Sequence, residues 1–340
     1  MFPELIDKLV RHENLTTDEA AAAMREVMEG RAAPAALAGF LTALVMKGEQ
    51  PAEIVGLAKA MREQVVTLEA PPGEVFDTCG TGGDRSGTFN VSSAAAVVVA
   101  ACGVKVAKHG NRSVSSRCGS ADLFERLGVT ITAPPAVVER SLREIDIAFF
   151  FAPTFHPSMR HAAPVRRELG IRTTFNLLGP LTNPAGARRQ IVGVPRPELT
   201  QVMARALMLL GSERAWVVHG AGGIDEISTT GHTKVSECRG GAVHTFFIHP
   251  SEFGIATAAS GDLLGGDATE NAEIVRRVLA GTPGPARDIV VLNAGAALLV
   301  AGRAASVREG IDMAEAAIES GAALAILDRM AQASRAEVVA

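Results

Sequence analysis

Three short polar stretches within residues 77–112 constrain the fold of this chain more than any other part of its sequence. They are the glycine-rich stretch 77–84 (DTCGTGGD), then 90–93 (NVSS), then 108–112 (KHGNR). Apolar runs precede the first and third stretches, and the alanine- and valine-rich run 92–102 accompanies the second. This order predicts a strand, a glycine turn, a helix and a second strand. Parallel strands arranged in this way bring their polar loops to one edge of a sheet.

The chemistry of these loops suits an anionic ligand. Glycines let the backbone approach a ligand closely, and free N–H groups at a helix start attract anions. Lys108 and Arg112 add positive charge at the same edge. The glycine turn is neither a phosphate-binding loop of the Gly-Lys-Ser/Thr type nor a Gly-x-Gly-x-x-Gly dinucleotide fingerprint. For the glycine-rich stretch alone, a turn that binds no ligand is the alternative. The combination of the three stretches predicts a site for a phosphate-rich ligand.

Composition narrows the class of protein. The chain has 340 residues, of which 47% are hydrophobic and 21% charged, enough for one large or two unequal domains. A net charge of −4 gives no electrostatic case for nucleic acid or a membrane surface as partner. The N-terminus lacks the basic start of a signal peptide, and the four cysteines are too scattered for a Cys-x-x-Cys site. We therefore expect a cytoplasmic enzyme.

The first 70 residues contain no convincing strand. Thr17 and the acidic residues after it predict a helix start that leads into Ala20–Glu29, and Pro34 and Pro51 fit the first turns of two further helices. Alternating strands and helices follow residue 70, which predicts a domain boundary there.

The rest of the chain predicts a mainly parallel α/β sheet whose last strands are antiparallel. The expected strands are Val75–Thr78, Val104–Ala107, Ile147–Phe151, Gln190–Val194, Ala215–His219, Thr233–Glu237 and Val243–Ile248. The expected C-terminal helices are Ala272–Leu279, Arg287–Ala301 and Val307–Met330.

The motifs together resemble one family, the anthranilate phosphoribosyltransferases, from about Leu5 to Ala325. The matching stretches are 80–84 (GTGGD), 90–93, 108–116 (KHGNRSVSS), 119–122 (GSAD), 155–157 (FHP), Arg166, 176–184 (NLLGPLTNP) and 225–226 (DE). Two residues depart from the family pattern. Ser93 stands where threonine is usual, and Cys118 stands where a small polar residue is usual. A hydrogen bond from Cys118 would be weaker.

The resemblance implies a fold of the nucleoside phosphorylase/phosphoribosyltransferase type, with a small all-helical domain beside a large, mainly parallel α/β domain. Residues 1–70 would form the helical domain, with about 157–184 packing back on it, and 71–156 and 185–340 would form the α/β domain. The implied reaction transfers the phosphoribosyl group of 5-phosphoribosyl 1-pyrophosphate to the amine of anthranilate, in tryptophan biosynthesis. The resemblance also implies a homodimer.

The resemblance carries site residues over position by position. The expected donor-binding residues are Gly80, Gly83, Asp84, Thr88, Asn90, Val91, Ser92, Ser93, Lys108, His109, Gly110, Asn111, Arg112, Ser113, Val114, Ser115, Ser116 and Ser120. The expected anthranilate-binding residues are Gly80, Asn111, His156 and Arg166. Arg166 offers planar two-point recognition of a carboxylate, although the adjacent Arg167 competes for this role on sequence alone. His109 and His156 either line the aromatic pocket or accept the amine proton.

Asp225 and Glu226 are expected to bind Mg²⁺, with the hydroxyl of Ser92 as a further ligand. A solvated acidic turn and a helix cap are the alternatives for these positions.

Two other functions remain open at this point. A pyrimidine nucleoside phosphorylase has a similar domain plan but uses free phosphate. A homologue that binds nucleic acid without anthranilate activity would be expected to lose the loop after Lys108 and to gain basic charge, whereas this chain keeps the loop and is slightly acidic.

Overall fold

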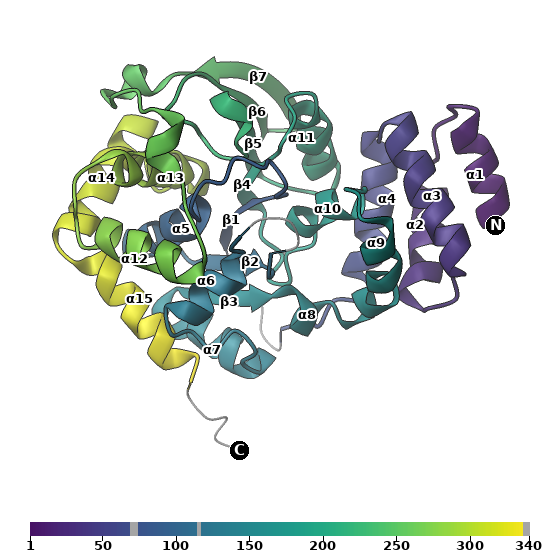
Figure 1. Cartoon of the computed structure of the whole chain (residues 1–340), viewed down its shortest axis with the longest axis horizontal. Helices are drawn as coiled ribbons and strands as arrows, with labels where there is room; N and C mark the ends of the chain where they lie inside the picture. The colour runs from purple at the N-terminus through teal and green to yellow at the C-terminus, as the bar shows by residue number, and fades with distance from the viewer. Residues whose placement is uncertain (69–73, 114–116, 336–340) are drawn as a thin grey trace.

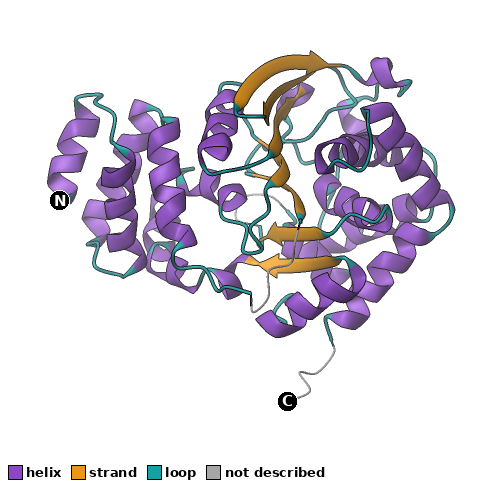
Figure 2. Cartoon of the chain, turned by 180° about the vertical axis from the view of Figure 1, so that it is seen from behind, coloured by secondary structure: helices purple, strands orange, loops and turns teal. Residues whose placement is uncertain are grey.

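The computed structural model describes residues 1–68, 74–113 and 117–335. Within these residues, a group of N-terminal helices lies to one side of a larger body in which helices flank a seven-stranded sheet (Figure 1). The view from behind shows the same separation of the N-terminal helices from the strands (Figure 2). The expected fold class is confirmed.

The described N-terminal helices are α1 (Phe2–Val10), α2 (Thr17–Met28), α3 (Pro34–Lys47) and α4 (Pro51–Arg62). Thr16 accepts a hydrogen bond from the backbone N–H of Glu19, whose carboxylate accepts one from the backbone N–H of Thr16. This reciprocal pair satisfies N–H groups at the start of α2. Pro34 and Pro51 begin α3 and α4, where a missing N–H costs nothing. The helix starts predicted at positions 17, 34 and 51 are confirmed.

The strands are β1 (Phe76–Gly80), β2 (Val106–Gly110), β3 (Ile147–Phe151), β4 (Arg189–Gly193), β5 (Arg214–Gly220), β6 (Thr233–Arg239) and β7 (Ala242–Ile248). Their order across the sheet is β3-β2-β1-β4-β5-β6-β7. Neighbouring strands from β3 to β5 run parallel, and β6 and β7 run antiparallel. Both expectations about strand direction are confirmed.

Strand β2 lies further along the chain than predicted. The sequence pattern places it at 104–107, whereas the structure has it at Val106–Gly110. Lys108 pairs with Phe149 and His109 with Phe150 in register with β3. Pairing with a hydrophobic neighbour strand extends β2 through polar residues because sheet context outweighs local propensity. Lys108 and His109 therefore project from a fixed strand rather than from a loop.

The C-terminal helices are α12 (Ala268–Leu279), α13 (Pro285–Ala301), α14 (Val307–Glu319) and α15 (Ala322–Ala333). The prediction of one helix over Val307–Met330 is wrong. Gly321 has a φ of 78° and interrupts the run. Glycine adopts this left-handed conformation readily, so it separates α14 from α15.

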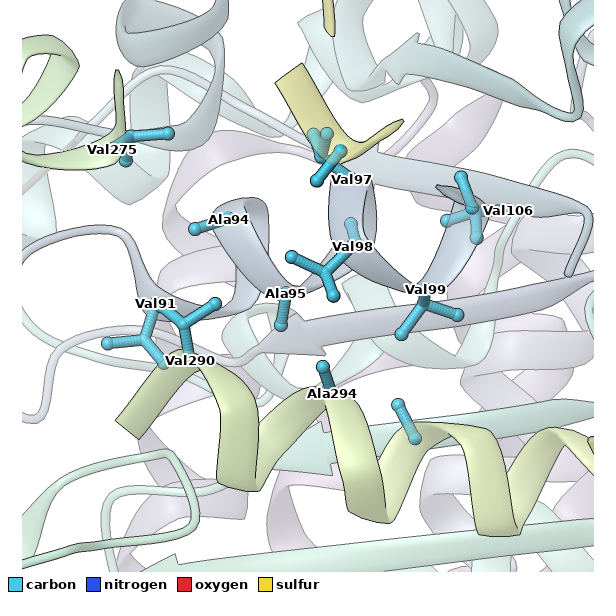
Figure 3. Packing of buried hydrophobic residues seen from close by; sticks show 14 of the residues in the cluster. Val91, Ala94, Ala95, Val97, Val98, Val99, Val106, Val275, Val290 and Ala294 are labelled. Atoms are coloured by element: carbon cyan, nitrogen blue, oxygen red, sulfur yellow. The ribbon is translucent and has the colours of Figure 1, made fainter. Parts of the chain in front are cut away.

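Helix α5 (Val91–Ala101) forms the centre of the α/β core. Its residues from Ala94 to Val99 are almost completely buried. A helix that is hydrophobic on all sides belongs in the interior. It contacts β1 and β2 on one side and α12 to α15 on the other, and Figure 3 shows its Val91 and Ala95 beside Val290 and Ala294 of α13. The polar residues at its first turn therefore stand on a rigid support.

The remaining described helices are α6 (Ser120–Arg126), α7 (Pro135–Ile145), α8 (Ala152–Phe155), α9 (Ala163–Leu169), α10 (Phe175–Leu178) and α11 (Leu199–Leu209), with the 3-10 turns η1 (Pro157–His161), η2 (Gly179–Leu181), η3 (Ala221–Gly223), η4 (Pro250–Phe253) and η5 (Ser260–Leu263). Turn η1 contacts α2, α9 contacts α3, and α10 contacts α4. These contacts bring the middle of the chain against the N-terminal helices. No helix among the described residues is long and apolar enough to cross a membrane.

Candidate active site

The main cavity lies where the strand order reverses. β1 and β4 are parallel neighbours, but the sheet grows from β1 toward β3 on one side and from β4 toward β7 on the other. Loops leave such a point in opposite directions and open a crevice at the carboxyl ends of the strands. A cavity of about 910 Å³ lies there. Residues of the glycine turn, α5, β2, α9 and α10 line it, together with Met61 of α4.

The cavity brings together most of the residues predicted from the sequence. Those that line it are Gly80, Gly83, Asp84, Thr88, Asn90, Ser92, Ser93, Lys108, His109, Gly110, Asn111, Arg112, Ser113, Ser120, His156, Arg166, Asp225 and Glu226. The side chain of Val91 instead lies in the core, which leaves its backbone for the expected donor contact. Val114, Ser115 and Ser116 lie outside the described residues.

The acidic residue Asp225 lies against the ends of β1 and β4. Gly80 and Gly193 are partners in the register of these two strands. A Cβ on either glycine would overlap Asp225, so both positions require the absence of a side chain. The Oδ2 atom of Asp225 accepts a hydrogen bond from the backbone N–H of Gly82 at 2.9 Å. Asp225 is thereby fixed to the glycine turn that follows β1.

Glu226 connects the same acidic pair to the start of α5. Its Oε1 atom accepts a hydrogen bond from the backbone N–H of Ser92 at 3.0 Å. Burial, joined by the charge of Asp84, raises the pKa of Asp225 to about 7. Burial, joined by the charge of Asp225, raises the pKa of Glu226 to about 8. The Glu226 carboxyl is buried and the neighbouring Asp225 carboxyl is half-buried, and two such adjacent groups favour a bound proton or cation over two free charges. The solvated acidic turn is therefore excluded as an interpretation of this pair.

The donor atoms at the acidic pair suit Mg²⁺. The carboxylates and the nearby hydroxyl of Ser92 are oxygen ligands, which hard cations prefer. The described residues contain no group of three or more His, Cys, Asp or Glu side chains arranged around one metal position. A metal held by this pair would therefore complete its coordination with water and with oxygens of a bound substrate.

Helix α5 is not capped by Ser92, so the alternative role of this serine as a helix cap does not apply. The residue that precedes the helix is Asn90, so Ser92 and Ser93 both lie inside its first turn and neither is the cap. The side chain of Asn90 donates to the carbonyl of Cys118 at 3.2 Å and accepts from the amide of Asn271 at 2.9 Å. The Ser93 hydroxyl is buried and has no hydrogen-bond partner among the described residues. A buried hydroxyl without a partner suits contact with a ligand.

Lys108 is almost completely buried in β2, with the carboxylate of Asp77 on β1 as its nearby counter-charge. Asp77 is fully buried as well. Its two oxygens accept hydrogen bonds from the backbone N–H of His109 at 3.3 Å and from the side-chain amide of Asn183 at 2.8 Å. Burial of a charge is costly unless it is paired and hydrogen-bonded. This arrangement holds a cation at the cavity wall.

His109 and His156 face each other with ring centroids 5.2 Å apart. Burial, joined by the electrostatic effect of His156, lowers the pKa of His109 to about 3, and burial lowers the pKa of His156 to about 4. Both rings are therefore neutral at pH 7. Their Nε2 atoms have no hydrogen-bond partner among the described residues. The pair forms an uncharged aromatic wall with polar atoms available to a ligand.

The loop after β2 is braced by α6. The guanidinium of Arg112 donates to Asp122 at 2.9 Å and to Glu125 at 2.8 Å. The other carboxylate oxygen of Asp122 accepts from the backbone N–H groups of Ser113 at 3.0 Å and Gly119 at 2.9 Å. Asp122 thus holds Ser113 and Gly119 on one carboxylate oxygen.

The structure separates Arg166 from its competitor Arg167. Arg166 lines the cavity, and its guanidinium carbon lies 5.2 Å from the centroid of the Phe175 ring. Arg167 is exposed and is not among the residues that line the cavity. A guanidinium stacked on an aromatic face keeps its edge free for a carboxylate.

Sequence reasoning missed Arg172, Asn183 and Asn271. Arg172 donates from Nη2 to the carbonyl of Thr81 at 3.1 Å. Asn183 holds Asp77, and Asn271 holds Asn90. These contacts join segments about a hundred residues apart or more, and no local periodicity signals them. The stretch 176–184, which the resemblance did mark, was the available signal for Asn183.

Two family models match the chain. The α/β domain of a glycosyl transferase family matches residues 72–324, and the helical bundle domain of such a family matches residues 3–65. Among curated proteins, the chain is 53% identical over 330 residues to the anthranilate phosphoribosyltransferase of Moorella thermoacetica, covering 97% of each chain. It is 54% identical over 336 residues to that of Rubrobacter xylanophilus, covering 98% of each.

Solved structures show the same likeness. The anthranilate phosphoribosyltransferase of Thermus thermophilus superposes with a TM-score of 0.91 at 45% identity, covering 98% of this chain and 99% of that one. The enzyme of Saccharomyces cerevisiae, solved in complex with PRPP and Mg, has a TM-score of 0.88 at 30% identity, with coverage of 98% and 97%.

Proposed function

The chain belongs to the anthranilate phosphoribosyltransferase family, and on that premise we propose where each substrate binds in its cavity. The protein transfers the phosphoribosyl group of 5-phosphoribosyl 1-pyrophosphate to the amine of anthranilate, a step of tryptophan biosynthesis. The function and enzyme class expected from the resemblance are confirmed. In the reaction the bond from the anomeric carbon to pyrophosphate breaks, a carbon–nitrogen bond forms, and the amine loses a proton.

The observation that carries the proposal is the position of the acidic pair. Asp225 and Glu226 are hydrogen-bonded to both the glycine turn and the first turn of α5. A pyrophosphate held there would have backbone N–H groups of a turn and a helix start around it. Lys108 supplies a buried positive charge to a phosphate oxygen, and the buried hydroxyl of Ser93 supplies a hydrogen bond.

Mg²⁺ is the metal that fits this site. The Saccharomyces cerevisiae relative was solved in complex with PRPP and Mg. Here the half-buried carboxyl of Asp225 and the buried carboxyl of Glu226 offer oxygen atoms, and both have raised pKa values. The metal neutralises the leaving pyrophosphate when bound. Asp225, Glu226 and the hydroxyl of Ser92 would hold it.

The acceptor binds on the side of the cavity that α9 and α10 form. Arg166 binds the anthranilate carboxylate, with Phe175 fixing the plane of the guanidinium. Asn111, Gly80 and His156 lie along the same cavity. His109 and His156 contact the aromatic ring and orient the amine. A group with a pKa near 3 or 4 is a weak base at neutral pH, so we assign the amine proton to solvent rather than to either histidine.

Three further expectations remain proposals. We propose that residues 1–70 and about 157–184 form one helical domain, which the contacts of α9 with α3 and of η1 with α2 support. The homodimer rests on the resemblance, and the cytoplasmic location rests on the scattered cysteines and the N-terminal composition.

The two alternative functions make different demands. A nucleoside phosphorylase needs one anion site for free phosphate, whereas the cavity here is lined by cationic side chains at two places, Lys108 and Arg166. A nucleic-acid-binding homologue would be expected to lack the loop after Lys108, which is present.

Loss of anthranilate fluorescence tests the proposal. With 5-phosphoribosyl 1-pyrophosphate and Mg²⁺ present, the purified protein should remove the fluorescence, and omission of either should stop it. Phosphorolysis of a pyrimidine nucleoside by the same protein, without any loss of anthranilate, would overturn the proposal in favour of the phosphorylase.

A further inference from the structure

Arg172 holds one peptide unit of the glycine turn from the opposite side to Asp225. Its Nη2 donates to the carbonyl of Thr81 at 3.1 Å, and the N–H of Gly82 in the same peptide unit donates to Asp225 at 2.9 Å. The carbonyl and N–H of a trans peptide point in opposite directions, so two such bonds fix the orientation of the whole plane. Arg172 and Asp225 thus hold the turn between them.

The contact also explains the glycine at position 83. Gly83 has a φ of 72°, which favours glycine, and a Cβ there would overlap the guanidinium of Arg172. The arginine therefore lies directly against the turn. Asp225 and Asp84 raise the pKa of Arg172, which burial lowers more strongly. The charge of Arg172 thus acts on Asp225 as well as on the turn.

The side chain of Arg172 projects from a segment that hydrogen bonds hold in place. The backbone N–H of Thr173 donates to Asn176 at 3.0 Å, and the hydroxyl of Thr174 donates to the buried carboxylate of Glu49 at 3.0 Å. Phe175 is buried beside them. A side chain projecting from a segment fixed in this way can position its partner accurately.

We propose that Arg172, which none of the site predictions included, is a positioning residue of the donor site. It orients the Thr81–Gly82 peptide so that the turn's N–H groups meet the donor phosphates, and it offsets negative charge at Asp225 and Asp84 until the metal arrives. This inference rests on the proposed function. It predicts opposite effects on the binding of two ligands. Loss of the positive charge of Arg172 should weaken binding of the anionic donor and strengthen binding of a divalent metal ion.

The test compares Arg172→Gln and Arg172→Lys with the wild type, and uses Arg167→Gln as a control for removal of an exposed arginine outside the cavity. Mn²⁺ binding to substrate-free protein is measured by electron paramagnetic resonance at about pH 8.5, above the raised pKa values of the acidic pair. Michaelis constants for donor and acceptor are measured in the presence of saturating Mg²⁺, and circular dichroism verifies folding.

Arg172→Gln should raise the donor KM about tenfold to a hundredfold and leave the acceptor KM within about twofold. It should also bind Mn²⁺ about threefold tighter or more. Arg172→Lys should keep wild-type Mn²⁺ affinity, because it keeps the charge, while its donor KM stays raised, because lysine lacks the planar fork. Arg167→Gln should match the wild type in every measurement.

Weaker Mn²⁺ binding in folded Arg172→Gln, or a donor KM within twofold of the wild type in both variants, would overturn the proposal. Should Arg172→Gln not fold, the donor KM of Arg172→Lys decides alone. If the wild type itself shows no anthranilate turnover, the proposed function fails, and Mn²⁺ binding still tests the electrostatic part of the role of Arg172.

Discussion

The carboxylate of Glu226 accepts a hydrogen bond from the backbone N–H of Ser92, 134 positions away in the chain. This bond joins the loop after β5 to the first turn of α5, which the packed core holds in place. Asp225 makes the matching bond to the glycine turn. The two acidic residues therefore tie the glycine turn to the start of α5, where we propose that the donor binds.

Replacing both acidic residues tests their role as metal ligands. Asp225→Asn with Glu226→Gln keeps shape and removes the charges, so the fold should persist while Mn²⁺ binding and turnover are lost. Calorimetric titration with Mn²⁺ and circular dichroism on the double variant measure this. Unchanged metal affinity in the folded double variant would remove the pair as ligands.

The raised pKa values of the pair predict a dependence of stability on pH. Asp225 and Glu226 bind protons in the folded state up to about pH 7 and about pH 8, whereas the unfolded chain releases them in the acidic range. Because the folded state holds more protons over this range, its free energy of unfolding falls as pH rises from the acidic range to about 8. The two groups thus cost stability in alkaline solution.

Mg²⁺ should relieve this cost. The melting temperature of the substrate-free protein should rise with Mg²⁺ more at about pH 9 than at about pH 6.5, because ionised carboxylates bind the metal. The charge-free double variant should show no such difference. Equal stabilisation by Mg²⁺ at both pH values would speak against raised pKa values at these residues.

Arg166→Ala should raise the KM for anthranilate about tenfold to a hundredfold, with a much smaller effect on the donor KM, because a charge-assisted contact is lost. Arg167→Ala should leave both constants unchanged, since Arg167 is exposed outside the cavity. Initial rates over both substrate concentrations measure the difference. A selective effect in Arg167→Ala instead would place the carboxylate site one residue along the helix.

The neutral histidine pair should add no step to the dependence of kcat on pH. With pKa values of about 3 and 4, His109 and His156 keep one protonation state from about pH 6 upward. Therefore neither histidine should give kcat an inflection near pH 6.5, the usual pKa of histidine. The folded state binds fewer protons than the unfolded chain below that pH, so stability should fall as pH drops from about 6.5 toward 4. His156→Asn should lose less stability over this range, and an unchanged acid dependence would contradict burial of a neutral ring.

Ser93→Ala tests the unpartnered hydroxyl. Because Asn90 and not Ser93 precedes α5, loss of the hydroxyl should change the melting temperature little. The donor KM should rise about two- to tenfold, because one hydrogen bond to the donor is lost. Ser93→Thr keeps the hydroxyl and should be nearly silent. A stability loss without a kinetic effect would exclude the donor contact.

Much of this arrangement was predictable from the sequence because the motifs are local. The glycine turn, the polar start of α5 and the acidic pair each follow a strand, and strand ends of a parallel sheet meet at one edge. The choice between Arg166 and Arg167 was not predictable from residue type, because the direction of each side chain depends on how α9 packs against α3 and Phe175.

Other features depend on contacts between distant segments. The extension of β2 through Lys108 follows from pairing with β3, and Asp77 needs Asn183 and Lys108 around it to be tolerated in the core. The contact of Arg172 with Thr81 spans 91 positions and leaves no periodic trace. In contrast, the break at Gly321 was visible, since an isolated glycine in a long helical pattern predicts an interruption.

We propose that this cavity exchanges pyrophosphate for anthranilate at one ribose carbon. Phosphorus NMR of the wild-type protein with both substrates and Mg²⁺ measures pyrophosphate release, while fluorescence measures anthranilate loss in the same sample. We expect the two quantities to stay equal throughout the reaction, and both to stop when a chelator removes the metal. Pyrophosphate release without anthranilate loss, or no pyrophosphate release by the folded protein, would contradict the proposed exchange.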